Sequence, residues 1–263
     1  MAFMSEPIFH LSDRAVISIH GPDTRDFLQR VVTNDMKLCF PGTIQVGALL
    51  TPQGKIVCDF QIHGEKNGVE LDIWADAADV LIKRLTLYRL RANAEISLDM
   101  GAFVISGKGS ADPRSSDLPQ RSIATEKPGA DGANRQVESE ISSGVPSFGR
   151  DYGEASVFPT DVNLDLYGGI GWKKGCFIGQ EVLSRMKRRG TIRKRTVSVS
   201  SKDRAMTVGE TIMAGDIPLG AITSSTGKSA LAIVRLDRFQ AATASPTIDG
   251  AVVTINTPLL AED

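Results

Sequence analysis

The most informative stretch of this sequence reads Lys173-Lys174-Gly175-Cys176-Phe177-Ile178-Gly179-Gln180-Glu181. A glycine before a helix lets backbone N–H groups point outward, and the helix dipole favours negative charge there. We expect a helix over Phe177–Arg188 that begins at Cys176 and places Cys176 and Gln180 on one face. A thiol at a helix start beside lysines favours the thiolate. The alternative is that Cys176 is a small buried hydrophobe, as free cysteines often are.

Basic residues crowd the segment after this stretch. Between Arg185 and Arg195, seven of eleven residues are basic: Arg185, Lys187, Arg188, Arg189, Arg193, Lys194 and Arg195. Such a run predicts an anion site for a polycarboxylate tail, phosphates or RNA, and the alternative is a solvated face. Glu181 and Arg185 lie four apart and can pair on a helix, which contributes about 0.3–0.5 kcal/mol when the pair is exposed.

The composition limits the class of protein. The chain has 263 residues, is 41% hydrophobic and 23% charged, and carries a net charge of −1. These values are typical of a globular protein of one to three domains with no overall attraction to nucleic acid. No apolar run approaches the roughly 20 residues that span a bilayer, and residues 1–7 lack the pattern of a secretory signal, so we expect no membrane partner.

The cysteines and histidines indicate a reducing compartment and no resident metal. Cys39, Cys58 and Cys176 are odd in number and widely spaced, which predicts free thiols and a cytoplasmic protein. The three histidines do not cluster at the spacing of metal ligands, so we expect no metal site. The chain also cannot supply four thiolates to an iron–sulfur cluster of its own.

The pattern along the chain predicts an α+β sheet packed on helices, followed by a small barrel. Residues 106–136 are rich in Pro, Gly, Ser, Asp and Lys, which predicts a surface loop or a partly disordered insertion. The expected domains are 1–195 and 196–263, and we expect no helix between the strands of the second. The expected strands are Ala15–His20, Ile44–Leu50, Lys55–His63, a half-buried Val69–Trp74, Thr196–Val199, Leu219–Thr223, Ser229–Val234 and Ala251–Ile255, and the expected helices follow Gly21 and cover Ala75–Leu90.

The quoted stretch and several other segments of the chain resemble the YgfZ family, and they occur in the same order as in that family. The family lies within the larger group that includes the aminomethyltransferase of glycine cleavage. The quoted stretch looks like the family signature, which Arg185 and Lys187 continue. The resemblance covers nearly the whole chain except 106–136. The other matching segments are Ile19–Asp23 with Phe27–Gln29 and Thr33–Asp35, Leu50–Lys55, Leu87–Arg91, Pro159 with Asn163 and Gly169, and Gly220–Arg235.

This resemblance implies a fold and a function. The fold would be a three-lobed aminomethyltransferase-like folate-binding core of two interlocked α+β subdomains, with a C-terminal β-barrel. Members of the family bind tetrahydrofolate in a central channel, where the signature cysteine lies. They support assembly or repair of [4Fe–4S] proteins, and bacterial members affect tRNA modification. The implied partners are therefore folate and iron–sulfur assembly proteins or their clients.

The candidate site residues combine this resemblance with the local chemistry. Cys176 is the candidate functional thiol, and the candidates for holding tetrahydrofolate are Asn34, Asp59, Tyr88, Arg91, Lys174, Gly175, Phe177, Gly179, Gln180, Glu181 and Arg185. Two positions depart from the aminomethyltransferases. Their adjacent acidic pair reads Cys58-Asp59 here, and Ser142 stands where their pterin-anchoring Glu precedes a Gly-apolar-Pro segment.

Three functions remain open from the sequence. The first is a folate-binding accessory factor for iron–sulfur proteins. The second is a folate-dependent aminomethyltransferase or demethylase, which the missing carboxylates disfavour because such a group positions the folate or moves protons. The third is an RNA-binding module that uses the basic run, which the low aromatic content of 6% disfavours.

Overall fold

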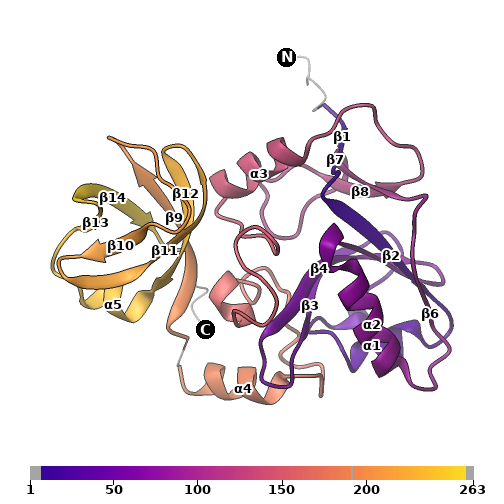
Figure 1. Ribbon diagram of the computed structural model, residues 1–263. Helices are drawn as coiled ribbons and strands as arrows, with labels where there is room; N and C mark the ends of the chain where they lie inside the picture. Colours follow the sequence, from indigo (N-terminus) through magenta and orange to yellow (C-terminus); the bar gives the residue numbers. More distant parts are fainter. Residues whose placement is uncertain (1–6, 191, 259–263) are drawn as a thin grey trace.

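The computed structural model describes residues 7–190 and 192–258. The described residues form an α+β core and a C-terminal barrel, which confirms the predicted fold class (Figure 1). Residues 1–6, 191 and 259–263 lie outside the described residues. The predicted domains include all of them, and Thr191 also lies within the basic run. No helix among the described residues is long and apolar enough to cross a membrane.

The largest sheet is antiparallel, with the strand order β3-β4-β5-β2-β6. One of its faces is apolar because Val69, Leu71 and Ile73 alternate along one strand and are fully buried. Helix α2 packs on this sheet through Leu81 and Leu85. The bounds are β2 (Arg14–His20), β3 (Ile44–Leu50), β4 (Ile56–Glu65), β5 (Gly68–Trp74), β6 (Glu95–Leu98), α1 (Thr24–Gln29), α2 (Ala78–Arg89), and the 3-10 turns η1 (Met36–Leu38) and η2 (Ala75–Ala77).

The opposite face of this sheet is polar and also buried. Asp72 is 0% exposed, and Gln61 and His63 are buried on the neighbouring strand. The expectation of a half-buried strand at Val69–Trp74 was therefore wrong for Asp72. Alternation predicts which residues share a face, but it does not say whether water or another polar surface covers that face.

A second, smaller sheet with the strand order β1-β7-β8 contributes to that cover. The predicted loop 106–136 contains regular structure: the end of β7, all of β8 and the start of α3. Its polar composition was misleading because Arg121 and Gln136 are buried against polar partners. The bounds are β1 (Phe9–His10), β7 (Phe103–Ser110), β8 (Arg121–Ala124) and α3 (Ala133–Ser142).

The chain between α3 and the barrel returns to the large sheet. This segment contains η3 (Pro159–Val162) and α4 (Gln180–Arg188), and Figure 1 shows it between the barrel and strands β3 and β4. Phe177 and Leu183 are buried in the same core as the strands of the large sheet. The signature is thereby anchored on the N-terminal half of the protein.

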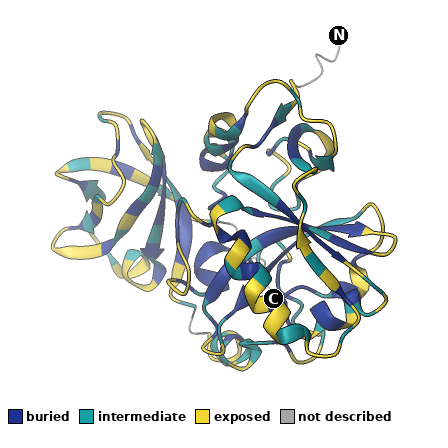
Figure 2. Cartoon of the chain, turned by 45° about the vertical axis from the view of Figure 1, so that its right-hand side comes forward, coloured by how far each residue is buried: buried dark blue, intermediate teal, exposed yellow. Residues whose placement is uncertain are grey.

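The C-terminal barrel is closed, with the strand order β10-β11-β12-β9-β14-β13. Its interior is a separate apolar core, and Figure 2 shows buried residues along its strands and exposed residues at its outer loops. A short helix, α5 (Leu236–Ala241), lies between two strands, so the expectation of no helix there was wrong. The strands are β9 (Lys194–Ser201), β10 (Thr211–Ala214), β11 (Ile217–Thr226), β12 (Ser229–Arg235), β13 (Pro246–Ile248) and β14 (Ala251–Asn256).

Candidate functional site

Residues 171–179, which we call the signature loop, present Cys176 at the surface. The expected helix does not include this residue: α4 begins at Gln180 after the N-cap Gly179. Cys176 and Gln180 therefore do not share a helix face, and the argument from the helix dipole does not apply to the thiol as expected. The alternative of a buried cysteine is also wrong, because the side chain of Cys176 is exposed.

Gly179 explains why the helix begins late. Its φ is +80°, and a Cβ at this position would lie 2.7 Å from the carbonyl oxygen of Thr51. The turn of the β3–β4 hairpin thus packs directly under the signature loop. Only glycine allows this close approach together with a left-handed backbone, so the chain turns here before it becomes helical.

Lys174 fixes the other end of the signature loop. Its Nζ donates hydrogen bonds to the carbonyl oxygens of Val32 at 2.6 Å and Asn34 at 2.5 Å. Burial lowers the pKa of Lys174 to about 8, with Asp35 opposing the change. Since a neutral amine still has two N–H donors, both carbonyls keep a partner in either protonation state. Cys176 is therefore exposed on a loop that is tied down on both sides.

The basic run is mostly a solvated surface beside this loop. Six of its members are exposed: Arg185, Lys187, Arg188, Arg189, Arg193 and Lys194. Arg195 instead is buried and pairs with Asp165 at 2.5 Å. Glu181 and Arg185 form the expected pair at 2.9 Å, with both side chains exposed. The Nζ of Lys187 lies 4.8 Å from the centre of the Trp172 ring.

A separate pocket lies where the polar face of the large sheet meets residues 146–167 and Arg114. Asp59 is the one predicted site residue that lines it, beside Arg14 and Gln61. The hydroxyl of Tyr152 donates to Asp59 at 2.5 Å. Burial raises the pKa of Asp59, although this hydrogen bond and the charge of Arg14 oppose the change.

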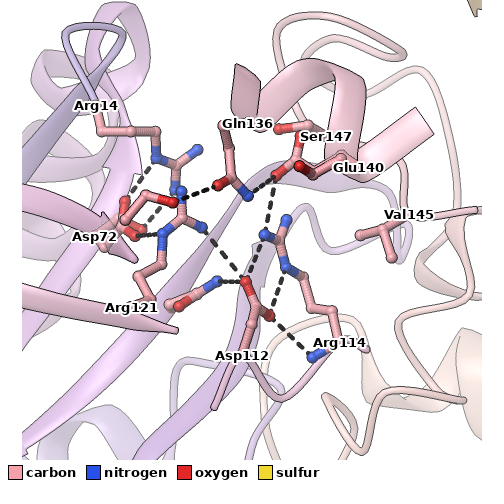
Figure 3. Close-up of polar contacts among 12 residues, drawn as sticks. Arg14, Asp72, Asp112, Arg114, Arg121, Gln136, Glu140, Val145 and Ser147 are labelled. Carbon is pink, nitrogen blue, oxygen red and sulfur yellow. Dashed lines mark hydrogen bonds and ion pairs between the residues drawn. The ribbon is translucent and has the colours of Figure 1, made fainter. Parts of the chain in front are cut away.

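Eight charged residues around this pocket form the central ion network, which holds four arginines and four carboxylates: Arg14, Asp72, Arg121, Asp112, Arg114, Glu140, Arg150 and Asp151. Figure 3 shows most of it, with Arg114 between Asp112 and Glu140. The network reaches the barrel because the hydroxyl of Thr223 donates to Asp151 at 2.7 Å. It joins the large sheet, the smaller sheet with α3, and the barrel.

The sequence did not lead us to this network. Its signal was the alternation of polar residues along two strands, Asp59, Gln61 and His63 on one and Glu70 and Asp72 on the next, of which only the second was interpreted as half-buried. Ser142, at the position of the missing anchor, is exposed, whereas Glu140 on the same helix is buried in the network.

The predicted folate-binding residues do not gather in one place. Lys174 contacts the Asn34 backbone beneath the signature loop, whereas Asp59 lines the pocket at the network. Tyr88 and Arg91 line a third, open hollow together with Asp23 and Arg30. Cys176 is not among the residues that line the pocket at the network.

The pocket at the network is too small for tetrahydrofolate when the side chains that line it have the conformations of this structure. The cavity has a volume of ≈ 20 Å³. That is room for about one water molecule, whereas pockets for drug-sized ligands measure about 300–1,000 Å³. Within residues 7–190 and 192–258, no cluster of three or more His, Cys, Asp or Glu side chains is placed to hold a metal ion.

Comparisons with known proteins agree with this fold. The family model described as "CAF17, C-terminal beta-barrel domain" matches residues 193–262. The mitochondrial iron-sulfur cluster assembly factor IBA57 homolog of Mycosarcoma maydis is 27% identical over 223 residues, which cover 71% of this chain and 55% of that protein. The mitochondrial iron-sulfur cluster assembly factor IBA57 of Homo sapiens is 27% identical, with 84% of this chain and 73% of that protein covered. The chain spans about half the length of the fungal relatives it matches.

A solved structure extends the likeness to the whole fold. The aminomethyltransferase T of the glycine cleavage system from Bartonella henselae superposes with a TM-score of 0.74 and covers 96% of this chain and 85% of its own. Its sequence identity of 15% means that this likeness establishes the fold alone. The predicted resemblance is thus confirmed: this chain is similar to members of the IBA57/CAF17 (YgfZ) family, and its fold is related to that of the glycine-cleavage aminomethyltransferase.

Proposed function

We propose that this protein is an accessory factor for the assembly or repair of iron–sulfur proteins and that the thiol of Cys176 is its acting group. The observation that carries the proposal is that Cys176 is exposed on an anchored loop, whereas Cys39 and Cys58 are buried. Burial raises the pKa of both buried thiols, which makes them poor nucleophiles and poor ligands. The relatives named as iron-sulfur cluster assembly factors support the same role.

The number of thiols also defines how the protein would act. A cluster with cysteine ligands alone takes four of them, and this chain offers one accessible cysteine. Cys176 would therefore contribute a single ligand to a cluster that a partner or client protein holds with the others. Thiolate-ligated clusters are anions, and the exposed Arg185, Lys187 and Arg188 next to the loop suit an anionic cargo.

A deletion strain of the source organism tests this role. Plasmids encode the wild type, Cys176→Ser and, as a matched control, Cys39→Ala, and the activity of [4Fe–4S] enzymes is compared with that of iron-free enzymes. We expect Cys39→Ala to restore the cluster enzymes and Cys176→Ser to fail at equal protein level. Equal restoration by both variants would eliminate Cys176 as the acting group.

Tetrahydrofolate binding and an effect on tRNA modification stay predictions from the resemblance. The role proposed for Cys176 needs neither, because the thiol and the pocket at the network are separate sites. The volume of that pocket and the bond between Tyr152 and Asp59 also disfavour an aminomethyltransferase reaction there, since the carboxylate is already engaged. An assay for methylenetetrahydrofolate formation from an aminomethyl donor checks that alternative.

A second candidate function is RNA contact through the basic run, which its six exposed members favour. A gel shift with tRNA, repeated from 50 to 200 mM salt, should weaken steeply and respond to Arg188→Ala with Arg189→Ala. No shift near physiological salt would dismiss this candidate. We further propose a reducing compartment such as the cytoplasm, because all three cysteines are free.

A further inference from the structure

Arg114 and Arg14 are the members of the central ion network that line the pocket, and Arg114 bridges two carboxylates there. Its Nη2 donates to Asp112 at 2.7 Å and to Glu140 at 2.9 Å, and its Nε donates to Asp112 at 3.0 Å. The side chain is only 11% exposed and lines the cavity with Asp59 and Tyr152. In Figure 3 the guanidinium points between the two carboxylates.

A guanidinium has a specific chemical likeness to a pterin. The amino-oxo-pyrimidine ring of a pterin is a cyclic guanidine, and its ring N–H and exocyclic amino group form two parallel donors. Such a fork is complementary to a carboxylate, as the guanidinium of arginine is. A buried carboxylate near this pocket can therefore take a pterin edge or an arginine, but not both.

We infer that Arg114 replaces the pterin: its guanidinium occupies the carboxylates that a pterin edge would bind, and thereby closes this pocket to folates. This inference is independent of the role proposed for Cys176.

The carboxylates around Arg114 already have other partners. Besides Arg114, Arg150 donates to Glu140 at 2.7 Å, and Gln61 donates to Asp112 at 2.9 Å. The remaining carboxylate in the pocket, Asp59, accepts the hydroxyl of Tyr152. Within the network itself, each of the four arginines lies beside at least one of the four carboxylates.

The local sequence holds the replacing group in place. The backbone N–H of Arg114 donates to Asp112 Oδ1 at 3.0 Å, so the two residues form an Asx turn around Pro113. Burial raises the pKa of Asp112, but Arg114 and Arg121 outweigh it, and the net pKa lies below its usual range. The carboxylate that orients the guanidinium is therefore charged at neutral pH.

Pterin binding to purified, full-length variants tests this inference. Tetrahydrofolate is titrated anaerobically by calorimetry, and 6-methylpterin, which lacks the bulky tail, is titrated by fluorescence. The proteins are the wild type, Arg114→Ala, Arg114→Ala with Glu140→Gln, and Arg204→Ala. Arg204 is the matched control because it also bridges two carboxylates, Glu210 and Asp249, but on the outside of the barrel.

We expect no saturable binding by the wild type up to millimolar ligand. Arg114→Ala should bind 6-methylpterin at least about tenfold tighter than the wild-type limit, which corresponds to about 1.4 kcal/mol. The added Glu140→Gln should remove this gain, and Arg204→Ala should show none. Low-millimolar guanidinium should also raise the melting temperature of Arg114→Ala more than that of Arg204→Ala, because it refills the vacated position.

Two results would overturn the inference. One is saturable micromolar binding of tetrahydrofolate by the wild type. The other is a folded Arg114→Ala protein that gains neither 6-methylpterin binding nor guanidinium-dependent stability. If Arg114→Ala does not fold, the wild-type titration decides the question alone. Neither titration involves Cys176, so failure of this inference leaves the proposed function intact, and the reverse holds as well.

Discussion

His63 should make the stability of the protein depend on pH between 7 and 5. The imidazole is buried on β4, and its Nε2 has no hydrogen-bond partner among the described residues. Burial lowers the pKa of His63 from 6.5 to about 4, and the charge of Arg121 adds to this while that of Asp72 opposes it. In the unfolded chain the imidazole titrates near 6.5.

The sign follows from the proton count. Between the folded and unfolded pKa values the unfolded chain binds more protons, so the free energy of unfolding falls as the pH falls. The full difference between 6.5 and about 4 corresponds to about 3 kcal/mol. Of this, about 2 kcal/mol should be lost between pH 7 and pH 5.

Urea unfolding of the wild type and His63→Gln at pH 7 and pH 5 measures this loss. Glutamine cannot be protonated, so the variant should lose about 2 kcal/mol less than the wild type over the same interval. Because the carboxylates titrate in both proteins, their contribution to the free energy of unfolding cancels when the two proteins are compared at the same pH. Equal losses for the two proteins would show that His63 is not held neutral by its surroundings, and the reasoning would be refuted.

Three further predictions concern contacts at and near the signature loop. Lys174→Met should cost about 2 kcal/mol by leaving two carbonyls without a donor, and hydrogen exchange should accelerate in residues 171–179. Gly179→Ala should cost more stability than Gly175→Ala in thermal melts, because both have positive φ but open space surrounds only the Cβ position of Gly175. Arg195→Met should lower the free energy of unfolding in urea by about 3 kcal/mol, because it leaves Asp165 half-buried and unpaired.

Each of these has a result that would contradict it. Unchanged exchange in the signature loop of Lys174→Met would mean that the loop is held by other contacts. Equal melting temperatures for the two glycine variants would mean that the hairpin turn can move away at no cost. An unchanged midpoint for Arg195→Met would show that the buried pair does not join the barrel to the core.

The sequence predicted the elements that follow apolar periodicity and missed those that depend on long-range polar pairing. The strands of the large sheet appeared close to their expected bounds because their apolar faces alternate regularly. The buried position of Asp72 was missed because its partner Arg121 is far away in the sequence, in a segment that composition marks as a loop. Composition records polarity, but it cannot tell a polar residue in water from one in a buried ion pair.

The candidate site was also predictable only where it depends on local sequence and not on a long-range contact. The sequence marked Cys176 and Lys174, which the structure places on one exposed and anchored loop. It misplaced the start of α4 because it treated Gly175 as the residue before the helix. The close approach of Thr51 to Gly179 decides that boundary, and this approach arises only when the β3–β4 hairpin packs under the loop.

The position of Arg114 has a consequence for how the folded population responds to metabolism. A protein that holds a free ligand in its core gains stability by mass action, about 2.7 kcal/mol at a ligand concentration of 100 times Kd, and it loses that contribution when the ligand is depleted. In this chain the group in the pocket is the guanidinium of Arg114, which is part of the protein and cannot be depleted. The abundance of the folded protein in the cell should therefore stay constant when the supply of reduced pterins changes.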